Sequence, residues 1–298
     1  MRSLAQRRRL VASVCLAGLV ALLALYGGLA VYKARDYTTT PRQPALTISP
    51  ADAGLVYQDV RFNSAADDSV QLAGWWIPNP TATRAIILVH GRNENRSSHL
   101  ALARPLWDAG YSVLLFNLRG HGDSTRASCT YGLREADDVV GAVAFVESQG
   151  VAAGQIGVLG WSLGAASALL AMDRSPDIGA VVSDSAYADS SPLLAHNALQ
   201  PGLRLAMRLT RGVNLADVRP DRALTHVAAT SSRHVFLIHG ALDSAVPLAQ
   251  FEKLRAAGGS GVAESWLVPD AGHLGAYGAH SDEYIARVVA FFNHELHG

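Results

Sequence analysis

Short apolar runs alternate along the chain with segments whose apolar residues recur at helical spacing. The apolar runs at 84–90, 112–116 and 156–159 predict buried strands, the first of them buried on both faces of a parallel sheet. Further strands are predicted at 178–183, 234–239 and 264–268. Helical spacing predicts helices between them, at 97–109, 133–148, 165–171, 247–257 and 281–294. This order predicts an α/β fold, an open and mostly parallel sheet with helices on both faces.

Two stretches depart from the alternation. Residues 55–62 and 70–77 predict two strands around a polar turn, a hairpin at one edge of the sheet. Residues 186–230 hold two short amphipathic segments, around 192–199 and 203–209. We therefore expect a helical cap insertion at 186–230, rising from the carboxyl edge of the sheet.

The N-terminal region carries the longest apolar run of the chain. A basic tail, residues 1–9 with Arg7, Arg8 and Arg9, precedes 23 residues without a charge at 10–32. As a helix this run would be about 35 Å long, enough to cross a bilayer, so we predict a single transmembrane anchor. Residues 33–54, rich in Thr and Pro, predict a linker. A cleaved signal peptide and a buried core helix are the alternatives.

Charge distribution sets the expected location and excludes one class of partner. The arginines before the apolar run favour an N-terminus inside the cell, with the rest of the chain on the non-cytoplasmic side of the membrane. Lys plus Arg and Asp plus Glu are both 25, so there is no electrostatic case for nucleic acid as a partner. The chain has 298 residues, of which 49% are hydrophobic. The part that follows the linker, 55–298, is therefore expected to form one domain with its own core. The oligomeric state stays open.

The sequence Gly160-x-Ser162-x-Gly164 lies between a predicted strand and a predicted helix. A serine on a sharp strand-to-helix turn needs neighbours without side chains, so that the two elements pack closely and the hydroxyl stands exposed. The helix that follows points its free N–H groups towards any oxyanion formed there. The motif thus predicts a nucleophilic serine.

Two further polar residues follow predicted strands in the same way. Asp243 comes just after the strand at 234–239, and His273 just after the strand at 264–268. Ligands of open α/β sheets bind beyond the carboxyl ends of the strands, so Ser162, Asp243 and His273 are expected at one edge. An imidazole can activate a serine hydroxyl, and a carboxylate can orient the imidazole.

At these residues the chain resembles the α/β-hydrolase family, over roughly 55–297. The resemblance is carried by His90-Gly91, Arg119-Gly120-His121-Gly122-x-Ser124, Gly160-x-Ser162-x-Gly164, His239-Gly240-x-x-Asp243-x-x-Val246-Pro247 and Gly272-His273. It implies a serine hydrolase without a cofactor, in which Ser162 is the nucleophile, His273 the base and Asp243 the acid. It also implies that the backbone N–H groups of Arg92 and Leu163 form the oxyanion hole.

The branch and the substrate class follow from the same resemblance. The chain is similar to the small membrane-tethered, BEM46-like or ABHD-like branch, whose substrates are commonly esters or thioesters. The expected partner is a small-molecule or lipid-like acyl ester. A serine peptidase or amidase of the same fold is the first alternative, and a catalytically inactive binding module is an alternative from another class.

Several residues compete for the roles of acid and base. Asp184, after the preceding strand, is the alternative acid, and Asp270 is too near His273 in the chain to be preferred. The histidines that follow Asp243 are alternative bases: His280, His294 and His297. Other residues in strand-end motifs are expected to brace loops: His90, His121, His239, Arg119 and Asp123. A metal site is not expected, since no His-x-His or His-Glu-x-x-His spacing occurs.

The insertion is expected to cover the acyl pocket and to set chain-length preference. Its apolar residues should line that pocket or touch lipid: Leu193, Leu194, Leu199, Leu203, Leu205, Met207 and Leu209. Arg204, Arg208 and Arg211 on the same segment predict a solvated face, with lipid headgroups or an anionic group of the substrate as the alternative contacts.

Overall fold

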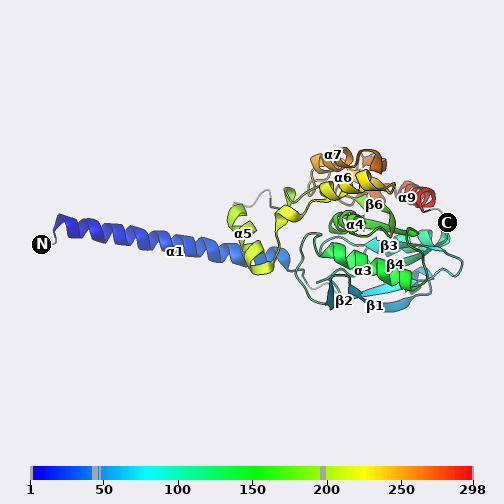
Figure 1. Cartoon of the computed structure of the whole chain (residues 1–298), viewed down its shortest axis with the longest axis horizontal. Helices are drawn as coiled ribbons and strands as arrows, with labels where there is room; N and C mark the ends of the chain where they lie inside the picture. Colours follow the sequence, from blue (N-terminus) through cyan, green and yellow to red (C-terminus); the bar gives the residue numbers. More distant parts are fainter. Residues whose placement is uncertain (1–2, 42–45, 47, 195–198, 297–298) are drawn as a thin grey trace. The chain divides into compact units, whose positions relative to one another are not determined.

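The computed structural model of the chain describes residues 3–41, 46, 48–194 and 199–296. Figure 1 shows the chain, which forms two compact units. We call Met1–Thr38 with Leu194–Leu215 the helical unit, and Thr39–Leu193 with Ala216–Gly298 the sheet unit.

The sheet unit is built on eight strands in the order β1-β2-β4-β3-β5-β6-β7-β8. β2 pairs antiparallel with β1 and with β4, and the other neighbours pair in parallel. This confirms the mostly parallel sheet with a hairpin at one edge. The strands are β1 Gln58–Ser64, β2 Asp67–Ile77, β3 Arg84–Val89, β4 Tyr111–Phe116, β5 Ile156–Trp161, β6 Ile178–Asp184, β7 His234–Gly240 and β8 Val262–Val268.

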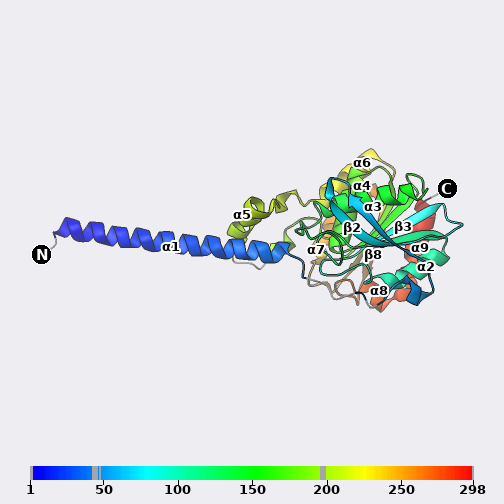
Figure 2. The ribbon, with the colours of Figure 1, turned by 90° about the horizontal axis from the view of Figure 1, so that it is seen from below.

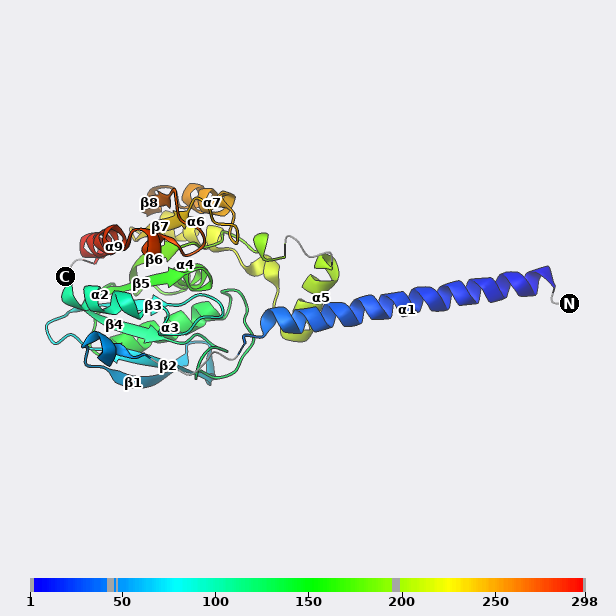
Figure 3. The ribbon, with the colours of Figure 1, turned by 180° about the vertical axis from the view of Figure 1, so that it is seen from behind.

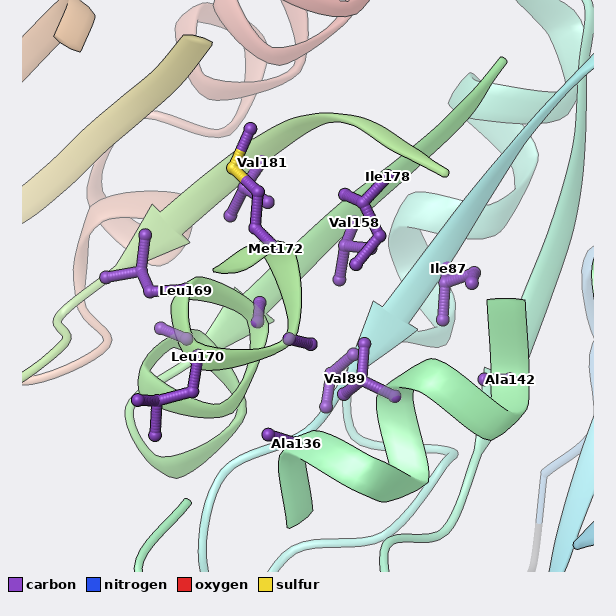
Figure 4. Close-up of a cluster of buried hydrophobic side chains, with 14 of the residues drawn as sticks. Ile87, Val89, Ala136, Ala142, Val158, Leu169, Leu170, Met172, Ile178 and Val181 are labelled. Atoms are coloured by element: carbon purple, nitrogen blue, oxygen red, sulfur yellow. The ribbon is translucent and has the colours of Figure 1, made fainter. Parts of the chain in front are cut away.

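Helices cover both faces of the sheet (Figure 2). On one face α3, α4, α6 and α7 bury apolar side chains, and on the other α2, α8 and α9 do so. Figure 4 shows the first of these cores, in which Leu169 and Ala136 lie with Ile87 and Val158. The helices are α2 Ala103–Asp108, α3 Glu135–Ser148, α4 Leu163–Arg174, α6 Pro220–Thr230, α7 Leu248–Gly258, α8 Ala276–Ala279 and α9 Ser281–Glu295.

The helix expected at 97–109 is shorter than predicted. Only a 3₁₀ turn, Leu100–Leu102, and α2 are helical there. The Asn95 side chain accepts hydrogen bonds from the backbone N and the Oγ of Ser97, at 2.9 and 2.6 Å. Such local side-chain bonds give the backbone an alternative to helical pairing, which delays the start of the helix.

The insertion expected at 186–230 divides between the two units. Leu194–Leu215, with α5 at Gln200–Arg211, groups with the helical unit. α6, by contrast, packs on α4 and α7 as the ordinary crossover helix from β6 to β7. It starts with Pro220 in its first turn and buries Ala223, Leu224 and Val227 at helical spacing. The prediction that the cap extends over 220–230 is therefore wrong.

The helical unit contains α1, Leu4–Thr38, and α5 (Figure 3). α1 extends beyond the predicted span of 10–32 at both ends, so its last turns occupy part of the predicted linker. Among the described residues, α1 alone is long and apolar enough to cross a membrane, by length and composition; a signal sequence near an N-terminus has the same features. The buried residues of α1 lie near its C-terminal end: Ala30, Ala34 and Thr38.

Candidate active site

The strand order reverses between β3 and β5, because the chain passes from β3 to β4 on one side and then to β5 on the other. In open α/β sheets the crevice at such a reversal, beyond the carboxyl ends of the strands, is where ligands bind. A Cβ atom on Gly91, after β3, would lie 3.5 Å from the carbonyl oxygen of Trp161, at the end of β5. The loop after β3 therefore runs beside the residue that precedes Ser162.

Ser162 occupies the sharp turn between β5 and α4. Its backbone angles, φ 49° and ψ −109°, lie in a region that residues with side chains rarely adopt. The turn is held from both sides, since the Ser162 N–H donates to the carbonyl of Asp184 at 2.9 Å and the Ala166 N–H donates to the carbonyl of Ser162 at 3.0 Å. These bonds hold Ser162 at the turn between β5 and α4, where the sequence motif predicts it.

The two glycines of the motif are required by close backbone packing. A Cβ on Gly164 would lie 2.1 Å from the carbonyl oxygen of Val89, and a Cβ on Gly160 would lie 2.4 Å from that of Gly164. Both distances are far shorter than any carbon-to-oxygen contact, and the facing atoms belong to the backbone. The turn, the start of α4 and the end of β3 therefore form one rigid contact that places Ser162.

Ser162, His273 and Asp243 form a continuous chain of hydrogen bonds. The Oγ of Ser162 lies 3.0 Å from Nε2 of His273, and Nδ1 of His273 lies 2.7 Å from Oδ2 of Asp243. Both contacts are satisfied by a neutral imidazole that carries its proton on Nδ1, donates it to Asp243 and accepts from Ser162. The structure thus brings together the three residues singled out in the sequence.

Backbone donors hold the Asp243 carboxylate in place. Its Oδ1 accepts from the N–H groups of Ala245 and Val246, both at 2.8 Å, which leaves Oδ2 for His273. Burial alone would raise the pKa of Asp243, but the hydrogen bonds from His273 and Val246 and the nearby imidazoles hold the pKa below its ordinary value. Asp243 is therefore an anion at neutral pH, suited to stabilise an imidazolium.

Direct backbone bonds join the two loops that carry Asp243 and His273. The Ala241 N–H donates to the carbonyl of Val268 at 2.8 Å, and the Leu242 N–H donates to the carbonyl of Ala271 at 2.9 Å. These bonds continue the pairing of β7 and β8 beyond the strands. The acid and the base are consequently fixed relative to each other by the edge of the sheet.

Three buried histidines brace the loops, as expected. Nε2 of His90 accepts from the Leu118 N–H at 3.1 Å, and Nε2 of His121 accepts from the Asn93 N–H at 3.3 Å. Nε2 of His239 donates to the carbonyl of Val246 at 3.1 Å. Burial lowers the pKa of all three imidazoles, to about 3 for His90, so they are neutral at physiological pH.

Arg119 and Asp123 also fix the loop that follows β4. Arg119 donates to Asp138 at 2.6 Å and to Ser64 at 2.7 Å, and this ion pair is fully buried. Asp123 accepts from Arg96 at 2.6 Å and from the Asn117 amide at 2.7 Å. Neither residue bonds to Ser162 or His273 in these interactions, which agrees with the loop-bracing roles expected for them.

The two residues expected to supply oxyanion donors lie at the two loops beside the strand reversal. Leu163 is the first residue of α4, and N–H groups in a first helical turn have no acceptor within the helix. Arg92 lies in the loop after β3, where the N–H of Gly91 donates to Glu94 at 2.6 Å and that of Asn93 donates to His121. The groups on both sides of Arg92 are thus engaged in holding the loop. The oxyanion hole itself stays a prediction.

The alternative acids have other partners. The Asp184 carboxylate accepts from the Ser185 hydroxyl at 2.8 Å and from the Tyr284 hydroxyl at 3.0 Å. Burial raises the pKa of Asp184 to about 6. Asp270 lies 2.8 Å from Nε2 of His280, so an alternative acid and an alternative base are paired with each other.

The remaining alternative bases lie in or beyond α9. His294 contacts the neighbouring Glu295 at 2.9 Å, and His297 lies outside the described residues. Among the described interactions, the Oγ of Ser162 contacts an imidazole nitrogen of His273, Nε2. The geometry therefore favours His273 as the base.

Two sets of residues around the site were not predicted from the sequence. Glu94 accepts from Gly91 and lies 3.1 Å from Nε2 of His99, whose ring stacks on Trp161 with centroids 3.5 Å apart. Ser185 joins Asp184 to the backbone N–H of Leu274, at 3.3 Å, directly after His273. Of these contacts, only the hydrogen bond from Gly91 to Glu94 joins residues three positions apart, so it alone could have been predicted from local sequence.

Across residues 3–41, 46, 48–194 and 199–296, no group of three or more His, Cys, Asp or Glu side chains could hold an ion.

Comparisons with known proteins identify the family of the chain. Residues 84–234 match the family described as alpha/beta hydrolase fold. The chain is 29% identical to the uncharacterized protein YfhR of Escherichia coli (strain K12) over 235 residues, 76% of this chain and 78% of YfhR. It is 30% identical to the uncharacterized protein Rv2307c of Mycobacterium tuberculosis over 238 residues, 78% of this chain and 76% of that protein.

Solved structures share the fold at lower identity. The Pyrococcus furiosus esterase Pf2001 is 23% identical with a TM-score of 0.71, and the match covers 87% of this chain and 100% of the esterase. The Pyrococcus horikoshii acylaminoacyl peptidase is 19% identical with a TM-score of 0.63, and the match covers 81% of this chain and 42% of the peptidase.

Proposed function

Because this chain belongs to the alpha/beta hydrolase fold family, we propose that it is a serine hydrolase in which Ser162, His273 and Asp243 form a catalytic triad. The observation that carries the proposal is the unbroken series of contacts from Ser162 Oγ through His273 to Asp243, at 3.0 and 2.7 Å. A serine that is merely structural needs no base at hydrogen-bond distance and no strained turn to expose it.

In the proposed first half-reaction, Ser162 Oγ attacks the acyl carbon while its proton passes to Nε2 of His273. The negative charge that develops on the acyl oxygen is stabilised by two backbone N–H groups. One belongs to Arg92 and the other to Leu163, the first residue of α4. Collapse of this intermediate releases the alcohol or thiol, which takes the proton from His273. Ser162 is left as an acyl ester.

Water completes the proposed cycle. His273 removes a proton from the water as its oxygen attacks the acyl ester, and then returns that proton to Ser162 Oγ as the carboxylic acid leaves. Asp243 stabilises the imidazolium form of His273 in both halves, which its low pKa permits. Every proton that His273 takes up is released in the same half-reaction, so the cycle needs no cofactor.

Carboxylic esters or thioesters are the proposed substrates. The structural neighbours include a protein named an esterase and another named a peptidase, so amides form the second candidate class. A catalytically inactive binding module is the candidate from another class, and it would have no need of the pairing between His273 and Asp243.

A substrate panel tests the proposal. Full-length protein in lipid nanodiscs would be given matched esters, thioesters and amides of graded acyl length, with Ser162→Ala as the blank. Ester or thioester turnover well above that of the matched amide, lost in Ser162→Ala, would support the assignment. Preferential amide turnover would favour the peptidase class, and turnover unchanged in Ser162→Ala would refute the triad.

The proposed location is a membrane, with α1 as a single anchor and the sheet unit on the non-cytoplasmic side. The uncharged run of α1 and the arginines before it support this. Protease added to right-side-out vesicles should digest the sheet unit. Protection would reverse the orientation, and a mature N-terminus beyond Tyr32 would show that α1 is a cleaved signal peptide.

A further inference from the structure

α5 is docked on α1 by contacts at both of its ends. The N–H of Gly202 donates to the Tyr26 hydroxyl at 3.0 Å, and Nε of Arg211 donates to the Thr38 hydroxyl at 3.0 Å. A Cβ on Gly202 would lie 2.5 Å from the Tyr26 ring, so only glycine allows this approach without a shift of the ring. α1 offers small buried residues over the same stretch, as closely packed membrane helices do, with Ala30 and Ala34 between the two bonds.

These contacts place α5 at the end of the uncharged run of α1. Tyr26 and Thr38 are about 18 Å apart along the helix, and Tyr32, the last residue of the run, lies midway between them. The charged residues Lys33 and Arg35 come directly after the run. Figures 1 and 3 show α5 crossing α1 obliquely. If α1 spans a bilayer, α5 therefore lies at the level where acyl chains meet headgroups.

The exposed surface of α5 is apolar on one side and basic on the other. Leu203, Ala206 and Met207 are buried, whereas Leu205 is 57% and Leu209 is 73% exposed. These two leucines are four residues apart and lie on one side of the helix. Arg204 and Arg208 precede them by one residue each, about 100° around the helix. Such division into adjacent leucine and arginine stripes is typical of helices that bind membrane surfaces.

We propose that α5 is an interfacial membrane-binding helix. Leu205 and Leu209 enter the outer part of the acyl layer, and Arg204 and Arg208 bind anionic lipid phosphates beside them. The inference rests on the proposed anchoring by α1, and it adds a second contact with lipid from a segment inserted between β6 and α6. It also replaces the expectation that these arginines form a merely solvated face.

A fluorescent label at position 205 tests the proposal. The background is Cys15→Ser, because Cys15 is exposed and the second cysteine, Cys129, is fully buried. Full-length Leu205→Cys carries an environment-sensitive nitrobenzoxadiazole label, and Ala229→Cys on an exposed position of α6 is the matched control. Both proteins are reconstituted in phosphatidylcholine vesicles with and without phosphatidylglycerol.

We expect the label at 205 to emit at shorter wavelength than the label at 229. Lipids that carry a doxyl quencher high on the acyl chain should quench it several-fold more strongly than the control. Aqueous iodide should quench the control more strongly. Emission at 205 like that at 229 would overturn the proposal. Protection at 205 from both quenchers would also overturn it, because a protein surface would then cover the leucines.

The arginines are tested in the same labelled protein. Arg204→Gln with Arg208→Gln should remove the increase in lipid quenching that phosphatidylglycerol causes, whereas Arg222→Gln on α6 should retain it. An unchanged response in the double variant would refute the phosphate contact.

Flotation of the vesicles separates this inference from the proposal on which it rests. Protein that floats with vesicles while the label at 205 reports water would refute the interfacial helix alone. Protein that fails to float would refute the anchor and the interfacial helix together, and would leave the triad to be judged by substrate turnover.

Discussion

Two regions of the molecule differ in how their side chains are covered. One is the set of loops that carry Ser162, Asp243 and His273, and the other is the helix α5. In the loops, polar atoms are satisfied within the chain: Asp243 accepts two backbone N–H bonds before it meets His273. The paired carboxylate of Asp243 is thereby held in a fixed geometry. In α5, by contrast, Leu205 and Leu209 remain more than half exposed. In the proposal made above, lipid covers the two exposed leucines of α5.

The largest effects are expected in the loops. Ser162→Ala, His273→Ala and Asp243→Asn should each lower kcat by about a thousandfold or more, because each removes one member of a series that acts as a unit. The fold should persist, since the backbone bonds that position the loops are untouched. Turnover on the best ester of the panel and circular dichroism are the measurements.

Two matched variants sharpen this prediction. His280→Ala and Asp184→Asn remove the alternative base and the alternative acid, and both should retain at least about a tenth of kcat, since neither group contacts His273 or Ser162 in the described hydrogen bonds. If His280→Ala abolished turnover and His273→Ala did not, the assignment of the base would be wrong.

The next largest effect concerns the packing behind Ser162. Gly164→Ala should lower the free energy of unfolding by about 3 kcal/mol, because the new methyl group meets backbone that has no room to move. Gly278→Ala is the control, since a Cβ there has nothing within 4 Å, and its effect should stay within about 0.5 kcal/mol. Denaturant titration measures both. Equal stability of the two variants would refute the rigid contact.

The contrast between the loops and α5 also explains what could be predicted from the sequence. The turn at Ser162 demands glycine on both sides, and parallel strands bring their carboxyl ends to one edge, so local motifs sufficed to predict Ser162, Asp243 and His273 together. The choice between Asp243 and Asp184 was harder. Both follow strands, and only the structure shows that Asp184 bonds to Tyr284 and Ser185.

The docking of α5 on α1 could not be predicted in this way. Gly202 and Tyr26 are 176 positions apart, and neither belongs to a pattern that names the other. The stacking of His99 on Trp161 is likewise a tertiary contact without a sequence signal. α6 was misplaced because its start was taken as part of the cap, although its apolar spacing is that of a helix packed on the sheet.

An effect of similar size, confined to the pH range above 4, is expected from the buried carboxyl of Asp184. Burial raises the pKa of Asp184 from 3.8 to about 6, so between these values the folded state binds a proton that the unfolded state lacks. The contribution of Asp184 to the free energy of unfolding is therefore largest below pH 4 and is lost as the pH rises through 6. The total loss is roughly 3 kcal/mol.

Asp184→Asn should remove this dependence, so the variant should gain stability relative to the native chain between pH 4 and pH 7. Denaturant titration at several pH values measures the gain. Asp282→Asn, at an exposed position of α9, should show no such gain. A parallel pH profile for native protein and Asp184→Asn would contradict the raised pKa.

The smallest effect on the sheet unit is expected from α5. Gly202→Leu should separate α5 from α1 and speed amide hydrogen exchange in α5, because its side chain collides with Tyr26. The melting temperature of the sheet unit should change by no more than about 1 °C. Gly28→Leu, on α1 where a Cβ meets nothing within 4 Å, should leave exchange in α5 unchanged. Equal exchange in both variants would show that the contact at Gly202 does not hold the helix.

The central claim is that Ser162 is a nucleophile activated by His273, and covalent labelling tests it most directly. A fluorophosphonate probe should add once to the full-length protein, and peptide mapping should place it on Ser162. The label should be absent from Ser162→Ala and formed about a thousandfold more slowly in His273→Ala. A label on another residue, or equal labelling of native protein and Ser162→Ala, would contradict the account.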